Sequence, residues 1–143
     1  MKEKLLISAC FLKSGFKYDG TDNLNQKVID LASKYDFILV CPEVDGGLSV
    51  PRLPSERLGD RVINIKGEDV TKNFHNGANK ALELAKKYDC KKALLKAKSP
   101  SCGKGIIYDG TFTHTKTSGH GVLCELLIKQ GITIFTEDEI EQL

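Results

Sequence analysis

Lys92-Ala93-Leu94-Leu95-Lys96-Ala97-Lys98-Ser99-Pro100-Ser101-Cys102-Gly103 begins as a short apolar run and ends in a turn that contains a cysteine. A run of this length bounded by turn-forming residues predicts a strand, which we place at 93–97. Pro100 and Gly103 end it. The Cys102 thiol is therefore expected on a tight loop at the carboxyl end of a strand. In open α/β sheets, ligands bind just outside such ends.

The composition is typical of a soluble globular protein, with 41% hydrophobic and 28% charged residues. The 143 residues predict a single domain spanning 1–143. The 21 basic and 19 acidic residues give a net charge of +2, which is too balanced to indicate nucleic acid or an anionic membrane as the main partner. We find no apolar run long enough to span a bilayer and no signal-peptide pattern, so we expect a cytoplasmic protein.

Apolar runs alternate with helical periodicity along the chain. The predicted strands are 5–9, 37–40, 93–97 and 132–135, with a further edge strand or extended segment at 61–65. The predicted helices are 24–35, capped by Asp22 or Asn23, 70–88, capped by Asp69, and 122–130, closed by Gly131. A capping box of Thr136 and Glu139 predicts a short terminal helix.

Two connections stand out. The segment 44–59 is predicted to be a long irregular loop with a functional role, because it lies beside a cysteine and a carboxylate. Asp109-Gly110 predicts a two-residue hairpin turn between 106–108 and 111–113. The element order indicates an α/β fold with a mostly parallel open sheet and flanking helices, a Rossmann-like three-layer arrangement, plus a β-hairpin.

Three of the five cysteines follow the carboxyl ends of predicted core strands. These are Cys10, Cys41 and Cys102. Because all carboxyl ends of a parallel sheet lie on one side, we expect the three sulfurs to face one cavity. Cys90 and Cys124 are left out of this group, and we expect them to be core residues. A metal or cluster site, a catalytic or redox thiol, and simple packing all remain open for the trio.

Three thiolates without an evident fourth ligand favour zinc, copper(I) or an iron–sulfur cluster. A closed zinc site needs four ligands, whereas a three-cysteine [4Fe-4S] cluster leaves one iron open as a thiophilic Lewis acid. His120 is the best placed histidine for a fourth ligand, with a solvated or capping role as its alternative. His75, in a helix, and His114, in the hairpin, are poorer candidates.

Polar side chains accompany these cysteines. Glu43 follows the second of them by two residues and is a candidate for general acid/base catalysis, or alternatively a surface or capping residue. Ser99 and Ser101 could orient water or substrate, or satisfy the turn. Arg52 and Lys96 could neutralise a cluster or bind an anion, and a lysine in an apolar strand needs a partner.

An ordered set of motifs extends over nearly the whole chain. The motifs are Ile7-Ser8-Ala9-Cys10, Tyr18-Asp19-Gly20, Cys41-Pro42-Glu43-Val44, Gly46-Gly47-Leu48, Pro51-Arg52, Gly67-Glu68-Asp69-Val70-Thr71, Leu95-Lys96, Ser99-Pro100-Ser101-Cys102-Gly103, Ile107-Tyr108-Asp109-Gly110-Thr111-Phe112, and Gly119 with Gly121-Val122. This set resembles the thiouracil desulfidase family, long classified as a domain of unknown function.

The resemblance implies a [4Fe-4S] cluster, which can be lost in air, held by Cys10, Cys41 and Cys102. It implies non-redox removal of sulfur from a small thiolated pyrimidine, from thiouracil to uracil and hydrosulfide. Glu43 would activate the attacking water, and Ser99 or Ser101 would assist. The substrate-binding residues would be Ser8, Tyr18, Arg52 and Lys96.

Two other hypotheses remain. The chain could be a thiol hydrolase or transferase with Cys102 as nucleophile and Glu43 as base, which needs one cysteine only. It could also be a non-enzymatic zinc-binding or sulfur-carrying module. Cysteine replacement tests the first of these, and metal analysis tests the second.

Overall fold

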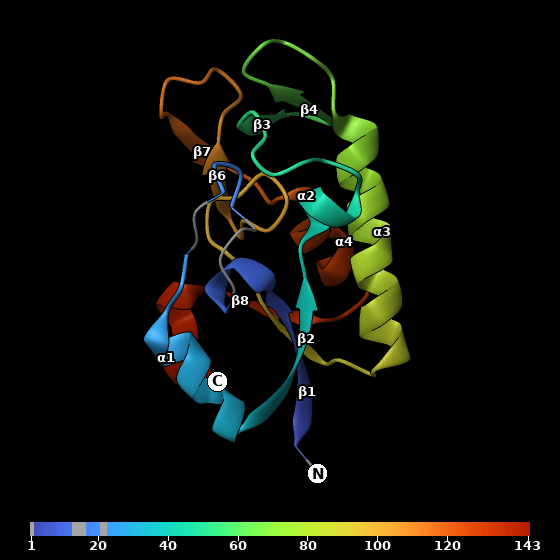
Figure 1. The fold of residues 1–143 in the computed structure, drawn as a ribbon, viewed down its shortest axis with the longest axis vertical. Helices are drawn as coiled ribbons and strands as arrows, with labels where there is room; N and C mark the ends of the chain where they lie inside the picture. The colour runs from blue at the N-terminus through green and yellow to red at the C-terminus, as the bar shows by residue number, and fades with distance from the viewer. Residues whose placement is uncertain (1, 13–16, 21–22) are drawn as a thin grey trace.

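The computed structural model describes residues 2–12, 17–20 and 23–143. In this part of the chain, four parallel strands form the main sheet in the order β2-β1-β5-β8 (Figure 1). They are β1 (Glu3–Ser8), β2 (Tyr35–Val40), β5 (Lys92–Leu94) and β8 (Thr133–Phe135). The parallel pairing places their carboxyl ends at one edge, as the sequence predicts.

Apolar side chains cover both faces of the sheet, because successive strand residues point to opposite sides. Leu6 and Ala93 pack with residues of α3 (Thr71–Lys87) and α4 (Val122–Lys129) on one face. Leu5 and Ile7 pack on the other face with residues from α1 (Gln26–Ile29) and the C-terminal segment. Figure 1 shows α3 and α4 on one side of the sheet and α1 on the other. The predicted three-layer α/β fold is confirmed.

The first helix is shorter than predicted. It consists of α1 followed by a 3₁₀ turn, η2 (Asp30–Ser33), and Tyr35 already belongs to β2. The N-cap is Asn25, whose side chain accepts a hydrogen bond from the Val28 N–H. The predicted cap at Asn23 is therefore wrong, and the alternative cap, Asp22, lies outside the described residues.

The segment 44–59 is more ordered than predicted. A helical turn, α2 (Pro42–Asp45), begins directly after Cys41, and β3 (Ser55–Leu58) pairs antiparallel with β4 (Arg61–Asn64). The strand predicted at 61–65 thus belongs to a separate two-stranded sheet. Gly59 has a φ of 61°, which suits the tight turn between β3 and β4.

The predicted two-residue hairpin turn is wrong. β6 (Ile106–Tyr108) pairs with β7 (Lys116–Ser118), so the connection is the longer loop 109–115. Glu56 of β3 accepts hydrogen bonds from the backbone N–H groups of Gly110 and Phe112. These hydrogen bonds from a distant strand stabilise the longer loop in place of a two-residue Asp-Gly turn.

The ends of other elements follow the prediction more closely. Gly131 after α4 has a φ of 80°, and the Thr136–Glu139 capping box is present, although it opens a 3₁₀ segment, η3 (Glu137–Gln142). The N-cap of α3 is Val70, one residue after the predicted Asp69. The Asp69 carboxylate accepts a hydrogen bond from the Thr71 N–H in the first turn of the helix.

β5 ends at Leu94, earlier than the predicted 97. The Leu95 N–H still donates to the backbone carbonyl of Phe135, but the two donors after it bond to side chains. The Lys96 N–H donates to Ser8 Oγ, and the Ala97 N–H donates to Glu137 Oε1. Among the described residues, no helix combines the length and the apolar character that crossing a membrane requires.

Candidate active site

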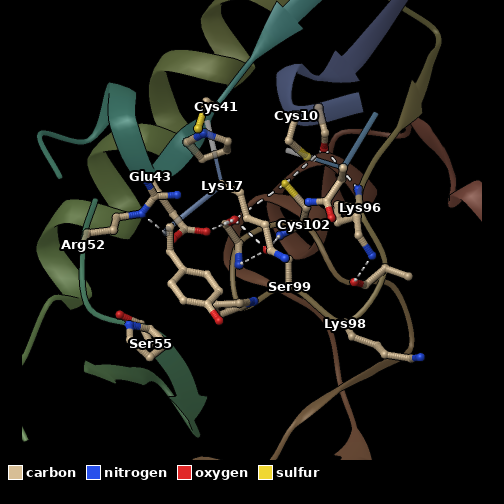
Figure 2. Close-up of a pocket in the computed structure, with 18 of the residues that line it drawn as sticks. Cys10, Lys17, Cys41, Glu43, Arg52, Ser55, Lys96, Lys98, Ser99 and Cys102 are labelled. Carbon is tan, nitrogen blue, oxygen red and sulfur yellow. Dashed lines mark hydrogen bonds and ion pairs between the residues drawn. The ribbon is translucent and has the colours of Figure 1, made fainter. Parts of the chain in front are cut away.

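A cavity of about 460 Å³ lies at the carboxyl ends of the strands. Its wall comes from the ends of β1 and β2, from α2, from the loop after β5, and from parts of β3 and the β6–β7 connection (Figure 2). All of the predicted site residues line it: Ser8, Cys10, Tyr18, Cys41, Glu43, Arg52, Lys96, Ser99, Ser101 and Cys102. Cys90 and Cys124 lie instead in the core with α3 and α4.

Each cavity cysteine follows a strand of the sheet. Cys10 lies in the 3₁₀ turn η1 (Ala9–Phe11) directly after β1, and Cys41 is the N-cap residue of α2 after β2. Cys102 lies in the turn after β5, where Ser99 Oγ accepts from the Cys102 N–H. Figure 2 shows Cys10 and Cys102 side by side and Cys41 apart from them, nearer Glu43.

Each of the three sulfurs receives a hydrogen-bond donor. The donors are the Asn23 side chain for Cys10, the Val44 backbone N–H for Cys41, and the Ser8 hydroxyl for Cys102. Ser101 Oγ lies 3.6 Å from Cys102 Sγ. Donors aimed at sulfur stabilise a thiolate relative to a thiol. Cys124 differs, since its neighbour, His120 Nδ1, already accepts from the Gly105 N–H and so offers it no proton.

Burial opposes ionisation of these thiols. It raises the pKa of Cys10 and of Cys41, and it raises the pKa of Cys102 to about 12. The three side chains are therefore neutral thiols near pH 7 unless a metal centre displaces their protons. The hydrogen-bond donors around each sulfur would stabilise the thiolate that forms when a metal centre displaces the thiol proton. The three thiols are therefore suited to become metal ligands.

The donor set fits a cluster better than a single ion. Within the described ranges, no group of three His, Cys, Asp or Glu side chains could hold one metal ion. A single zinc would need its sulfurs about 4 Å apart, because Zn–S bonds are about 2.3 Å long. In a [4Fe-4S] cluster each thiolate binds a different iron, so thiols spread over one cavity wall are compatible with it.

Glu43 is held between a cation and a hydroxyl. Arg52 Nε lies 3.0 Å from Glu43 Oε1, and the two side chains are only 7% and 16% exposed. Ser101 Oγ donates to Glu43 Oε2 at 3.1 Å and lies 2.9 Å from Ser99 Oγ. The carboxylate is thus fixed at the cavity wall with a hydroxyl beside it.

Ser99 and Ser101 differ in their contacts. Ser99 Oγ accepts from the backbone N–H groups of Ser101 and Cys102, so it organises the turn. Ser101 Oγ faces the carboxylate of Glu43 and the sulfur of Cys102. The second serine is therefore the one in contact with the reactive groups.

Lys96 forms an ion pair, as expected for a lysine in an apolar strand. Its Nζ lies 2.6 Å from Glu137 Oε2, at the start of η3. Tyr18 is 39% exposed at the cavity, and Lys17 Nζ lies 5.9 Å from the centre of its ring.

Sequence reasoning missed several residues of the wall. These include Lys17, Asn23, Glu56, Lys98, Tyr108 and His114. His114 reaches the cavity, whereas His120, the histidine favoured as a fourth ligand, is not part of the wall. Tyr108 lies in a motif of the resemblance, and that was the only signal for it. Lys17 and Lys98 adjoin the predicted residues Tyr18 and Ser99, and that adjacency could have found them. His114 lies in the loop 109–115, whose course depends on contacts across the fold.

The fold and the cavity together define a three-layer α/β protein with a thiol-lined site at the strand ends. The chain belongs to the 2-thiouracil desulfurase family, whose model matches residues 5–139. This confirms the resemblance found in the sequence.

Two similar proteins span nearly the same length. The chain is 34% identical over 149 residues to the "Uncharacterized protein YbbK" of Bacillus subtilis (strain 168), covering 97% of this chain and 99% of that protein. Its structure matches that of the [4Fe-4S]-dependent thiouracil desulfidase TudS with a TM-score of 0.93 and 41% identity. That match covers 99% of this chain and 95% of the other.

Proposed function

We propose that this protein is a [4Fe-4S]-dependent thiouracil desulfidase that replaces the sulfur of thiouracil with oxygen from water. The balanced reaction is C=S + H₂O → C=O + H₂S, without net oxidation or reduction. Family membership and the match to TudS support this reaction. The observation that carries it is that three cysteines from three strand ends line one cavity, each with a donor aimed at its sulfur.

Cys10, Cys41 and Cys102 would hold the cluster. A [4Fe-4S] cluster with three thiolate ligands supplies an open, Lewis-acidic iron with affinity for a substrate sulfur. The surrounding chain would hold the three sulfurs and supply their hydrogen bonds. The free thiols and the oxygen sensitivity of such a cluster suit a reducing cytoplasm.

Glu43 would act on the water. Its carboxylate takes a proton as the water oxygen bonds to the thiocarbonyl carbon, and Arg52 holds it in place through the ion pair. The Ser101 hydroxyl, which donates to Glu43 Oε2, orients the water beside that carboxylate. The proton that remains on the attacking oxygen passes to the sulfur as the C–S bond breaks and C=O forms. Hydrosulfide leaves, and Glu43 holds the second proton of the H₂S that the reaction releases.

The cavity offers several contacts for the pyrimidine. Tyr18 presents an aromatic ring beside Lys17, and Lys96 presents a cation held by Glu137. Arg52 contributes positive charge, although its Nε is bonded to Glu43. We expect Tyr18 and Lys96 to contact the ring and its polar substituents.

The structure weakens the rival with Cys102 as a nucleophile. Burial raises the pKa of Cys102 to about 12, so this thiol is protonated near pH 7 rather than a thiolate nucleophile. Glu43 Oε2 bonds to Ser101 rather than to that sulfur. A zinc-binding module would require a single-ion site, which the described residues do not form.

Anaerobic purification tests the proposal. The protein should be brown, absorb near about 400 nm, contain iron and acid-labile sulfide, and convert 2-thiouracil to uracil and sulfide. Cys10→Ser, Cys41→Ser and Cys102→Ser should each lose iron and turnover, whereas Cys90→Ser, in the core away from the cavity, should keep both. Turnover by an iron-free protein, or loss of activity in Cys102→Ser alone, would favour the nucleophile instead.

A further inference from the structure

Ser8 is a buried hydroxyl between the sheet and the cavity. It is the last residue of β1, is 3% exposed, and lies in the cavity wall. Its Oγ accepts a hydrogen bond from the Lys96 N–H at 3.1 Å and donates to Cys102 Sγ at 3.5 Å. The Lys96 N–H donates to a lone pair of the Ser8 oxygen, and the single hydrogen of the Ser8 hydroxyl is directed at the Cys102 sulfur.

The sheet determines where Ser8 lies. The β1–β5 register ends with Ile7 opposite Leu94. The Ser8 side chain bonds the next available N–H, that of Lys96, and so extends the contact between the strands. The hydroxyl is therefore fixed by a rigid element, which is where precise positioning is achieved most easily.

Ser101 does not duplicate this role. Its Oγ lies 3.6 Å from Cys102 Sγ, but it also lies 3.1 Å from Glu43 Oε2. A hydroxyl has one hydrogen, and a carboxylate is a stronger acceptor than a sulfur. The Ser101 hydrogen therefore belongs to Glu43, and Ser8 is left as the hydroxyl committed to Cys102.

We propose that Ser8 is a positioning residue for Cys102: its hydroxyl orients the sulfur and stabilises negative charge on it as a ligand. The inference rests on the proposed function, since it takes Cys102 as a cluster ligand. It replaces a direct role of Ser8 in substrate binding. Hydrogen bonds to ligand sulfurs favour the reduced, more negative cluster, so this one raises the reduction potential and slows iron loss.

The test compares Ser8→Ala, which removes the donor, with Ser8→Thr, which keeps it. Ser55→Ala serves as a matched control, because Ser55 is a serine of the cavity wall on a different strand, β3. Anaerobically reconstituted proteins are assayed for iron transfer to a chelator and for reduction potential by EPR-monitored titration. Ser8→Ala should lose iron about tenfold faster and have a lower potential, while Ser8→Thr and Ser55→Ala should behave like the wild type.

Melting of the cluster-free proteins checks that Ser8→Ala is folded. A raised KM for thiouracil with unchanged iron loss and potential would place Ser8 in substrate binding and overturn the inference. Identical iron loss and potential in Ser8→Ala and Ser55→Ala would overturn it as well, with the proposed function intact. A wild-type protein that takes up no iron–sulfur cluster would overturn both.

Discussion

Ser101 Oγ lies 3.1 Å from Glu43 Oε2, although the two residues are 58 positions apart in the chain. The contact joins the loop after β5 to the first turn of α2, and it connects a hydroxyl donor with the proposed base. Ser99, two residues earlier, makes its hydrogen bonds to the backbone of the same turn and to Ser101 Oγ. The two serines therefore have separable roles.

Ser101→Ala should lower kcat about 100-fold, because it removes the group that orients water beside Glu43. Ser99→Ala should have a smaller effect on kcat and should destabilise the protein by about 1–2 kcal/mol, since two backbone N–H groups lose their acceptor. Steady-state kinetics and urea unfolding measure the two effects. Equal losses of kcat in both variants would contradict this division.

Glu43→Gln should lower kcat about 10²- to 10⁴-fold, because an amide cannot accept the proton from water. The amide oxygen can still accept from Arg52, so iron content should stay at the wild-type level. The matched control is Glu83→Gln on the exposed face of α3, which removes the same charge far from the cavity. A cluster-loaded Glu43→Gln protein with wild-type kcat would show that another group is the base.

Gly77→Ala should disturb the site through helix packing. A Cβ at Gly77 of α3 would lie 1.7 Å from the Pro42 carbonyl oxygen, so α2 would have to move, and Glu43 with it. We expect a stability loss of about 3 kcal/mol together with reduced kcat. Gly131→Ala is the control, because its positive φ costs about 1 kcal/mol while a Cβ there meets nothing within 4 Å. Thermal melts and kinetics should separate the two variants, and a Gly77→Ala protein as stable as Gly131→Ala would argue against this close approach.

The Cys124 thiol should make stability depend on alkaline pH. Burial raises its pKa from 9.0 to about 12, so above pH 9 the thiol ionises in the unfolded chain before it does so in the folded one. The contribution of this neutral thiol to the free energy of unfolding is complete below pH 9. It is lost as pH rises towards 12, and the free energy of unfolding falls by up to about 1.4 kcal/mol per pH unit. The free energies of unfolding of the cluster-free wild type and of cluster-free Cys124→Ala should therefore converge as pH rises from 9. Parallel pH profiles would show that this thiol does not titrate differently on folding.

The four core strands were predictable, although not their exact ends, because buried parallel strands appear in the sequence as local apolar runs. The positions of Cys10, Cys41 and Cys102 at one sheet edge follow from topology alone, and the structure bears this out. Local rules failed where a distant side chain competes with them. The Asp109-Gly110 turn did not form a tight hairpin, because Glu56 bonds the loop backbone from another strand.

The amino-acid pattern by itself determined the parallel sheet, the three loops that carry thiols and the family to which the chain belongs. Periodicity and motif order are properties of the sequence itself, so they can be recognised without knowing how the chain packs. Only the tertiary structure decided which donor meets which sulfur and that Ser101, rather than Ser99, bonds to Glu43. Ser8 and Cys102 are 94 residues apart, and a hydrogen bond over such a separation depends on the packed positions of whole strands.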